Sequence, residues 1–193
     1  EELNTKFQTA VKNVFKIKPL FLSAKINTGV KIRMPNLNEI GADRIANAAG
    51  AYVLYRHPVI VIDFGTATSF DIVNGKGEFI GGVIAPGINL QLKSLNKFTS
   101  KLPRIEAAQS PCAIGNNTVD AILSGVIRGC ACMIEGLVAQ CEEELGEHAV
   151  VVATGGYASS IAEYMKRPFD YINPTLTLEG LRHLYNINQL AVV

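Results

Sequence analysis

The segment from Val59 to Val73 constrains the fold of this chain more than any other. Four consecutive apolar residues, 59–62, predict a buried strand, and Asp63 follows directly. Gly65 is expected to let the backbone turn tightly and to leave N–H groups open to an anion. A second strand is predicted from Thr68 to Val73. A strand–Asp-x-Gly-Thr–strand hairpin suits a site that cradles phosphate beside a cation, although an ordinary β-hairpin with a solvated carboxylate has the same pattern.

Hydroxyl and glycine residues surround this turn. Thr66 and Thr68 are expected to add hydroxyl donors to the same site. After the second strand, the Asn-Gly-Lys-Gly sequence at 74–77 predicts a tight turn into a third strand.

Composition limits the kind of partner. The chain has 193 residues, and 48% of them are hydrophobic, which is enough for one sizeable core or two small lobes. Eighteen basic residues face seventeen acidic ones, for a net charge of +1. Because no dense Lys/Arg run accompanies this balance, we expect a small anionic ligand and no nucleic acid.

A membrane span and a zinc site are not expected either. The N-terminal residues do not have a signal-peptide pattern, and the apolar stretch from Val119 to Val138 is interrupted by charged residues. The four cysteines form no C-x-x-C pair, which favours free thiols over zinc or disulfides. We therefore expect a cytoplasmic protein. The cysteines are Cys112, Cys130, Cys132 and Cys141.

Helices and strands alternate along the chain, which predicts an α/β fold. Helices are predicted over 3–15, 43–56, 87–97, 117–146, 156–166 and 178–185. Strands are predicted over 19–24, 30–34, three times between 59 and 85, and over 148–154.

The sequence Gly41-Ala42-Asp43-Arg44 begins one of these helices. Asp43 in a first turn suits the helix dipole, and by itself it has the pattern of a simple cap. An aspartate beside an arginine also stays ionised and can accept a proton from a hydroxyl, while Arg44 can bind a carboxylate by two parallel hydrogen bonds. The pair therefore predicts a small molecule that carries a hydroxyl and an acid group.

Two further segments are less specific. Gly155 and Gly156 separate a strand from a helix, and such a turn lets a nucleotide lie against bare backbone. The sequence Ile114-Gly-Asn-Asn-Thr118 begins a helix, where capping and a contact with a substrate hydroxyl are equally good interpretations.

Together with three more segments, these motifs resemble the type III pantothenate kinases. The match in order and spacing runs from about residue 29 to the end of the chain. The matching segments are Gly41 to Arg44, Asp63 to Thr68, Gly81 to Gly87, Leu102-Pro103, Ile114 to Thr118, Thr154 to Gly156 and Leu176 to Leu181.

The resemblance implies an α/β fold of the actin-like ATPase superfamily, with two ribonuclease H-like lobes around a nucleotide cleft. Residues 1–57 would be the remainder of the first lobe, and 58–193 would be the second. The family opens with a strand and an Asp-x-Gly-Asn-Thr phosphate loop that residues 1–29 do not contain. The first lobe is therefore expected to be incomplete at its N-terminus.

The resemblance also implies an activity, the transfer of the ATP γ-phosphoryl group to the hydroxyl of pantothenate in coenzyme A synthesis. Asp43 would be the proton acceptor, and Gly41, Ala42 and Arg44 would line the substrate site. Thr118 would contact pantothenate, either from the same chain or from the second subunit of a homodimer.

The same resemblance implies the cofactors. Asp63 would hold a monovalent cation, K⁺ or NH₄⁺, and Mg²⁺ would accompany the ATP phosphates. Thr66 would touch phosphate, and Gly65, Gly155 and Gly156 would be further ATP contacts.

One departure and two alternatives follow from the residues. Many relatives have an aromatic residue shortly before the Gly-Ala-Asp-Arg motif, where this chain has Met34. A relative without the first phosphate loop could be a non-catalytic regulatory or binding protein. A sugar kinase of the same superfamily is a third interpretation, but sugar kinases do not share the 41–44 motif in this form.

The long predicted helix also bears on assembly. Its apolar residues and its small residues are spaced for a helix–helix interface, which predicts a homodimer built on residues 117–141. The alternative is that this helix is buried in its own lobe. The apolar stripe is Val119, Ile122, Val126, Met133 and Leu137, and the small residues are Ser124, Gly125, Gly129 and Gly136.

Overall fold

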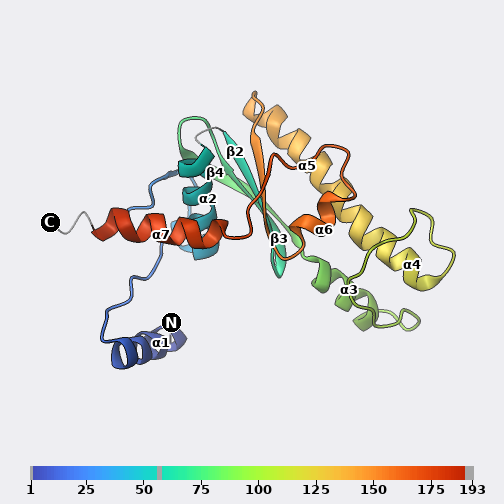
Figure 1. Ribbon diagram of the computed structural model, residues 1–193, viewed down its shortest axis with the longest axis horizontal. Coiled ribbons are helices and arrows are strands. Elements are labelled where there is room, and N and C mark those ends of the chain that lie inside the picture. The colour runs from blue at the N-terminus through green and yellow to red at the C-terminus, as the bar shows by residue number, and fades with distance from the viewer. Residues whose placement is uncertain (1, 56–57, 190–193) are drawn as a thin grey trace.

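The computed structural model describes residues 2–55 and 58–189, with helices on both faces of one mixed sheet (Figure 1). The six strands of this sheet lie in the order β1-β4-β3-β2-β5-β6. They are β1 (Lys31–Ile32), β2 (Val59–Phe64), β3 (Ala67–Val73), β4 (Glu78–Pro86), β5 (Val150–Gly155) and β6 (Tyr171–Ile172). The α/β prediction is confirmed.

An antiparallel meander forms the centre of the sheet. β2 pairs with β3 from Val59–Val73 to Phe64–Thr68, and β3 pairs in turn with β4. On the other side of β2, β5 runs parallel, with Asp63 opposite Thr154. The carboxyl ends of β2 and β5 therefore meet at the same edge of the sheet.

Side-chain alternation divides the core into two layers. On one face, Val61 and Val73 pack beneath α2 (Ala42–Tyr55) and α7 (Leu176–Gln189). On the other face, Ile60, Ile62 and Phe70 pack beneath the remaining core helices. Those helices are α3 (Ile88–Lys97), α4 (Thr118–Leu123), α5 (Gly129–Leu145) and α6 (Ala158–Ala162).

A π-helical turn, Ser124–Arg128, joins α4 to α5 in one long helix. Within the described residues, Thr118–Leu145 is the helix long and apolar enough to cross a membrane, with a mean hydropathy of 1.7. Its charged residues alone do not rule out that role. However, 44% of that apolar window is buried inside the protein, and Cys130, Ile134 and Val138 belong to the core. Core packing therefore explains why this helix is apolar.

The helix only partly confirms the predicted apolar stripe. Ile122 and Val126 are buried in the chain's own core, so they are not available to a second subunit. Gly125, Gly129 and Gly136, in contrast, have no atom within 4 Å of an added Cβ, so the small-residue face is open.

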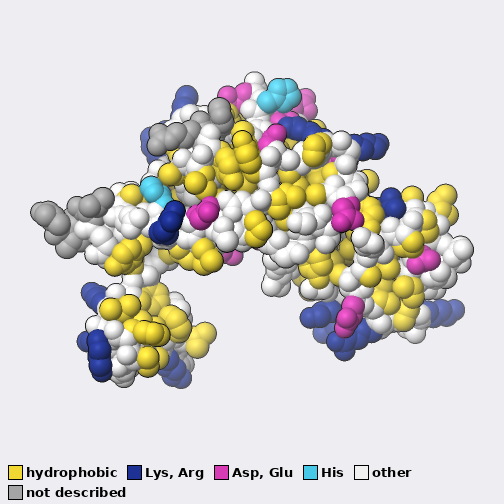
Figure 2. Space-filling view, in the orientation of Figure 1, with side chains coloured by type: hydrophobic (Ala, Val, Ile, Leu, Met, Phe, Trp, Pro, Cys, Tyr) yellow, Lys and Arg dark blue, Asp and Glu magenta, His cyan; other side chains and the backbone are white. Residues whose placement is uncertain are grey.

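The N-terminal residues differ most from the prediction. Helix α1 (Glu2–Phe15) forms as expected, but residues 19–24 are not a strand, and only Lys31–Ile32 of the predicted 30–34 strand pairs with β4. In Figure 1, α1 lies apart from the sheet at the end of an extended segment. Figure 2 shows yellow and dark blue side chains side by side on it, in keeping with the exposure of Phe7 and Phe15. The predicted strand over 19–24 is therefore wrong: the apolar residues there have no neighbouring strand to pair with among the described residues.

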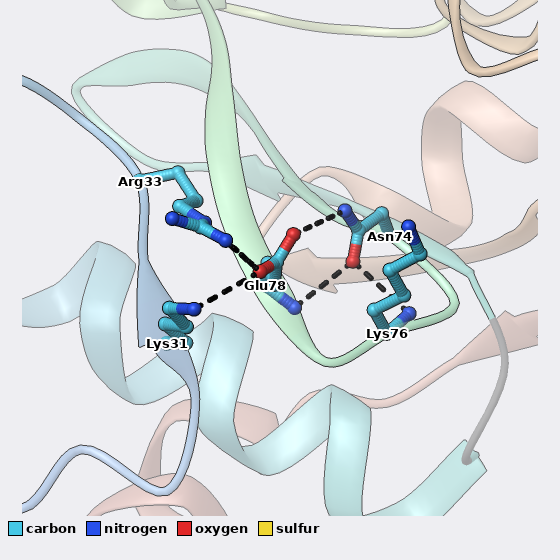
Figure 3. Close-up of polar contacts among 5 residues, drawn as sticks. All are labelled: Lys31, Arg33, Asn74, Lys76 and Glu78. Carbon is cyan, nitrogen blue, oxygen red and sulfur yellow. Dashed lines mark hydrogen bonds and ion pairs between the residues drawn. The ribbon is translucent and has the colours of Figure 1, made fainter.

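Strand β1 is held to β4 by charge as well as by backbone pairing (Figure 3). Arg33 donates from Nε to Glu78 Oε1 at 2.9 Å, and Lys31 Nζ lies 3.6 Å from the same oxygen. Asn74 donates to the second carboxylate oxygen at 3.1 Å. Hydrogen bonds from Arg33 and Asn74 lower the pKa of Glu78 to about 2, so this carboxylate stays ionised.

A second carboxylate anchors the loop that precedes β6. Glu142, near the end of α5, accepts two hydrogen bonds from the Arg167 guanidinium, at 2.6 and 2.9 Å. Its Oε1 also accepts from the backbone of Ala149 at 3.1 Å. These hydrogen bonds, above all those from Arg167, lower the pKa of Glu142 to about 2. Such a bidentate pair fixes the loop by geometry as well as by charge.

Two glycines let α2 and α7 pack backbone against backbone. A Cβ added at Gly180 would collide with the carbonyl oxygen of Ala46, and one added at Gly50 would lie 2.9 Å from the Gly180 Cα. The matched segment 176–181 therefore has a packing role, because only glycine fits at position 180.

Gly180→Ala is expected to destabilise the protein by about 1–3 kcal/mol, because α7 must move away from α2 to admit the methyl group. Gly50→Ala should cost less, since its closest approach is longer. Urea unfolding of the variants measures both effects. Gly75→Ala is the matched control, because its Cβ would meet Pro58 at an ordinary 3.4 Å. Equal stability of Gly180→Ala and the parent protein would contradict the close packing.

Candidate functional site

The candidate site lies at the edge of the sheet where β2 and β5 end. Asp63 is the penultimate residue of β2, and its side chain is on the α2 face of the sheet, as are Val61 and Val73. Gly155, at the end of β5, has φ +87°, and its added Cβ would lie 2.7 Å from the Phe64 backbone and 2.8 Å from Asp63 Oδ1. Gly155 thus allows the turn at 155–156 to lie directly beside the Asp63 carboxylate.

The turn between β2 and β3 is the second wall of this edge. Gly65 N donates to Ala67 O at 3.0 Å, and Thr66 O accepts from Gly87 N at 3.1 Å. A side chain at Gly87 would collide with Thr66 O, which explains why a glycine precedes α3. Gly65 itself does not have a positive φ, and its Cβ would fit at 3.5 Å, so the expected conformational need for glycine there is wrong. What Gly65 contributes is open space, since Gly65 and Thr66 are both exposed.

Thr68 does not join the site. Its side chain is 1% exposed and belongs to the face of β3 that carries Phe70 and Ile72. Its hydroxyl has no hydrogen-bond partner among the described residues. The expectation of two hydroxyl donors from this turn is therefore wrong for Thr68, because strand alternation turns it into the opposite layer.

A hydrogen bond from Asn47 orients the Asp63 carboxylate, and a second helix orients Asn47 in turn. Asn47 of α2 is fully buried and donates from Nδ2 to Asp63 Oδ2 at 2.9 Å. Thr177 of α7 donates to Asn47 Oδ1 at 2.7 Å, which leaves the amide nitrogen facing Asp63. Burial raises the pKa of Asp63, the hydrogen bond from Asn47 lowers it, and the negative charge of Asp43 raises it again.

Asp43 lies in the first turn of α2, within electrostatic reach of Asp63 and Asp71. Its side chain is exposed, and its Oδ1 accepts only from the neighbouring Arg44 N, at 2.9 Å. Asp43 is the second residue of α2 and therefore not its N-cap, although this bond satisfies one N–H of the first turn; Oδ2 remains free of any hydrogen bond from the described residues. That oxygen is available to a ligand at the same edge as Asp63.

Arg44 has a partner that the sequence did not predict. Its Nε donates to Asp71 Oδ1 at 2.6 Å, and its Nη2 donates to Phe70 O at 3.3 Å. The Arg44 side chain is 12% exposed and Asp71 is fully buried. Burial raises the pKa of Asp71 to about 7, and Arg44 opposes this rise. The whole guanidinium of Arg44 is thus not free for a substrate carboxylate, because Nε and one N–H of Nη2 already donate to Asp71 and Phe70.

Thr118 lies elsewhere in the chain. With Pro86, Gln91, Leu95 and Ile122, it lines a largely apolar groove of about 660 Å³ between α3 and α4. This groove is on the sheet face opposite α2, and Figure 1 shows α2 and α4 on opposite sides of the molecule. The chain by itself therefore brings Asp43, Arg44 and Asp63 together but leaves Thr118 apart.

The residues at this edge include oxygen atoms that could hold a cation. Asp63 Oδ1 accepts no hydrogen bond from a described residue, so one carboxylate oxygen is free to coordinate. The hydroxyl residues Ser69 and Thr154 are opposite Asp63 on the flanking strands. Among the described residues, no group of three His, Cys, Asp or Glu side chains could hold a metal. Asp63 therefore offers a free carboxylate oxygen beside two hydroxyl residues.

Three residues of this site were absent from the sequence-based prediction: Asn47, Asp71 and Thr177. Asp71 gave a usable signal, because a carboxylate interrupts the apolar run that ends β3. Asn47, in an alanine-rich helix, gave a weaker one. Thr177 gave none, since its role depends on the distant α2.

Comparison with known proteins identifies relatives over nearly the whole chain. Residues 1–140 match the family described as type III pantothenate kinase. A protein of that name from Dehalococcoides mccartyi strain CBDB1 is 52% identical over 188 residues, which cover 97% of this chain and 71% of that protein. Its counterpart from Myxococcus xanthus is 43% identical over 98% of this chain and 73% of its own length.

A solved structure supports the fold. The crystal structure titled conserved putative Baf family transcriptional activator, from Campylobacter jejuni, superposes with a TM-score of 0.65 at 22% identity. The superposition covers 95% of this chain and 79% of that one. At this identity, the likeness shows a shared architecture.

Proposed function

The chain belongs to the type III pantothenate kinase family, and we propose that it transfers the γ-phosphoryl group of ATP to the hydroxyl of pantothenate, the first step of coenzyme A synthesis. The observation that carries this proposal is the convergence of Asp43, Asp63 and the Gly155 turn at one edge of the sheet. A hydroxyl acceptor, a phosphate and a cation would all have a place there. A regulatory role without catalysis is not favoured, since the relatives bear the name of the kinase.

We assign proton acceptance to Asp43. Its exposed carboxylate stands at the N-terminus of α2 with Oδ2 free, so a substrate hydroxyl can approach it directly. Phosphoryl transfer requires little covalent chemistry from a protein, and most of the rate comes from positioning and charge neutralisation. A single well-placed carboxylate is therefore sufficient on the acceptor side.

The acid group of pantothenate would be bound next to Asp43. The backbone of Gly41 and Ala42 leads into α2, whose positive end favours an anion. Arg44 follows, with three of its five N–H donors not used by described residues. The substrate carboxylate would therefore bind the free N–H groups of Arg44, while the bonds to Asp71 and Phe70 hold the rest of the guanidinium in place.

ATP would lie against the two turns at the edge of the sheet. Gly65 and Thr66 form one wall, and Gly155 and Gly156 form the other. Phosphate oxygens next to Asp63 would be repelled unless a cation lay between them, so we propose that Asp63 holds K⁺ or NH₄⁺. Mg²⁺ is expected to arrive on the phosphates, which is its usual mode of binding to kinases.

A homodimer would bring Thr118 to the substrate. Within one chain, Thr118 is on the face opposite Asp43, so its proposed contact with pantothenate requires the second subunit. The open face of Gly125, Gly129 and Gly136 would allow two helices to approach closely.

We place the reaction in the cytoplasm. All four cysteines are free thiols, as expected for a protein of that compartment.

Asp43→Asn is expected to lower the turnover of the full-length enzyme by about 10²–10⁴-fold, the usual contribution of a positioned general base. Pantothenate should still bind, because the amide keeps the shape of the side chain. A coupled ADP-release assay measures turnover, and calorimetry measures binding. Glu143→Gln, an exposed carboxylate on α5, is the control. Undiminished turnover in Asp43→Asn would remove this residue from the role.

Activity is expected to require K⁺ or NH₄⁺, with Na⁺ a poor substitute at matched ionic strength. Asp63→Ala should lose this dependence together with most of the activity, since its carboxylate would no longer hold the cation between itself and the phosphates. Titration of each chloride salt in the coupled assay measures the effect. An enzyme equally active in sodium alone would contradict the assignment of Asp63.

Light scattering at micromolar concentration should give the mass of a dimer. Gly129→Arg should shift the mass toward the monomer and lower turnover, because a long charged side chain would separate the two helices. Glu143→Arg, farther along the same long helix, should leave the dimer intact. A monomeric parent protein would contradict the homodimer.

A further inference from the structure

We propose that Asp71 is a positioning residue that holds Arg44 in the orientation needed to receive the carboxylate of the substrate. This inference rests on the proposed function, because it names how that same site recognises the acid group. Asp71 would not touch the substrate itself. It would act through Arg44.

Arg44 is confined on three sides. Asp71 Oδ1 accepts from its Nε at 2.6 Å, and Phe70 O accepts from its Nη2 at 3.3 Å. The Phe79 ring lies beneath the guanidinium, with its centroid 5.6 Å from Cζ. Because a guanidinium is planar, two hydrogen bonds and one ring contact fix both its direction and its rotation.

The strand next to Asp71 is shaped to admit this guanidinium. Gly82 of β4 pairs with Asp71 of β3. A Cβ at Gly82 would collide with Phe70 O and would lie 2.5 Å from Arg44 Nη2. The Phe70 backbone therefore requires glycine at position 82, and the same lack of a side chain leaves room for the Arg44 guanidinium.

The burial of Asp71 is energetically unfavourable for a residue that would serve only the stability of the fold. The side chain is fully buried, and its Oδ2 has no hydrogen-bond partner among the described residues. Burying a carboxylate with one unpaired oxygen is unfavourable, and apolar residues of similar size commonly do as well or better in a core. A carboxylate at this position is best explained by what it does to Arg44.

Arg44 is also next in sequence to the proposed proton acceptor, Asp43. Asp43 precedes Arg44 in the first turn of α2, and the Arg44 N–H donates to Asp43 Oδ1 at 2.9 Å. The N–H donors of Arg44 that remain free would bind the acid group of a hydroxy acid, while Asp43 Oδ2 would accept from its hydroxyl.

The test is the kinetics of Asp71→Asn with two substrates, pantothenate and its primary amide, which lacks the carboxylate charge. At a pH above neutrality, KM for pantothenate should rise at least about tenfold, the equivalent of about 1.4 kcal/mol, while kcat changes little. KM for the amide should not change, since Arg44 has no carboxylate to bind there. An unchanged KM for pantothenate would overturn the proposal. A lower KM would also overturn it, because it would mean that Asp71 only neutralises the charge of Arg44 and so weakens the binding of the substrate carboxylate.

A double-mutant cycle shows whether Asp71 acts through Arg44. In an Arg44→Met background, Asp71→Asn should have no further effect on KM for pantothenate. An additional loss in that background would contradict the proposal. Should Asp71→Asn not fold, Arg44→Lys keeps the charge but loses the planar fork, and it should show the same selective rise in KM. An unchanged KM in Arg44→Lys would equally overturn the inference.

Glu78→Gln is the matched control, because Glu78 is also a strand carboxylate paired with an arginine, but outside the site (Figure 3). Neither KM should change in that variant. The parent enzyme distinguishes the two levels of inference. If it does not phosphorylate pantothenate, the proposed function fails. If it does and the selective rise is absent, only the role of Asp71 fails.

Discussion

The site depends on how α2 is held between the sheet and α7. Seven consecutive residues of α2, from Ile45 to Ala51, are buried, and most of them are alanine or glycine. Small residues on all sides let a helix approach a sheet and a second helix at once. The contact of Gly180 with Ala46 brings α7 close enough for Thr177 to reach Asn47. The orientation of Asp63 therefore depends on backbone packing as much as on hydrogen bonding.

Electrostatic balance is the second constraint on this edge. Asp43, Asp63 and Asp71 lie within electrostatic reach of one another, and Arg44 is the cation that pairs directly with one of them. Such a cluster is negative overall, which opposes the binding of ATP. A bound cation would reverse this, and the free Oδ1 of Asp63 is the atom best placed to hold it. The proposed phosphoryl transfer would therefore need an ion at this edge, since charge neutralisation provides much of its rate.

Two carboxylates outside the site, Glu78 and Glu142, form ion pairs with a different purpose. Glu78 joins the short edge strand β1 to β4, and Glu142 joins the loop before β6 to α5. Both carboxylates have a lowered pKa, whereas that of buried Asp71 is raised. The difference is physical: Glu78 and Glu142 gain more from their hydrogen bonds than they lose by burial, while Asp71 is more deeply buried and keeps one oxygen unpaired. The costly carboxylate is the one inside the candidate site.

The sequence by itself determined the elements and the motifs. The apolar run at 59–62, the Asn-Gly turn at 74–77 and the helix-start motif at 41–44 are local signals, and the hairpin and α2 formed where those signals predicted. The sequence did not determine the edge strands of the sheet. Whether a short segment such as 19–24 forms a strand depends on a neighbouring strand to pair with, which the local pattern does not reveal.

Only the tertiary structure decided the partners. That Arg44 faces Asp71, that Thr177 orients Asn47, and that Thr68 turns into the opposite layer each depends on residues far apart in the chain. The same is true of Thr118, which strand and helix packing place on the other face of the sheet. A sequence records which groups are present, but the direction of a buried side chain follows from the packing of distant segments against it.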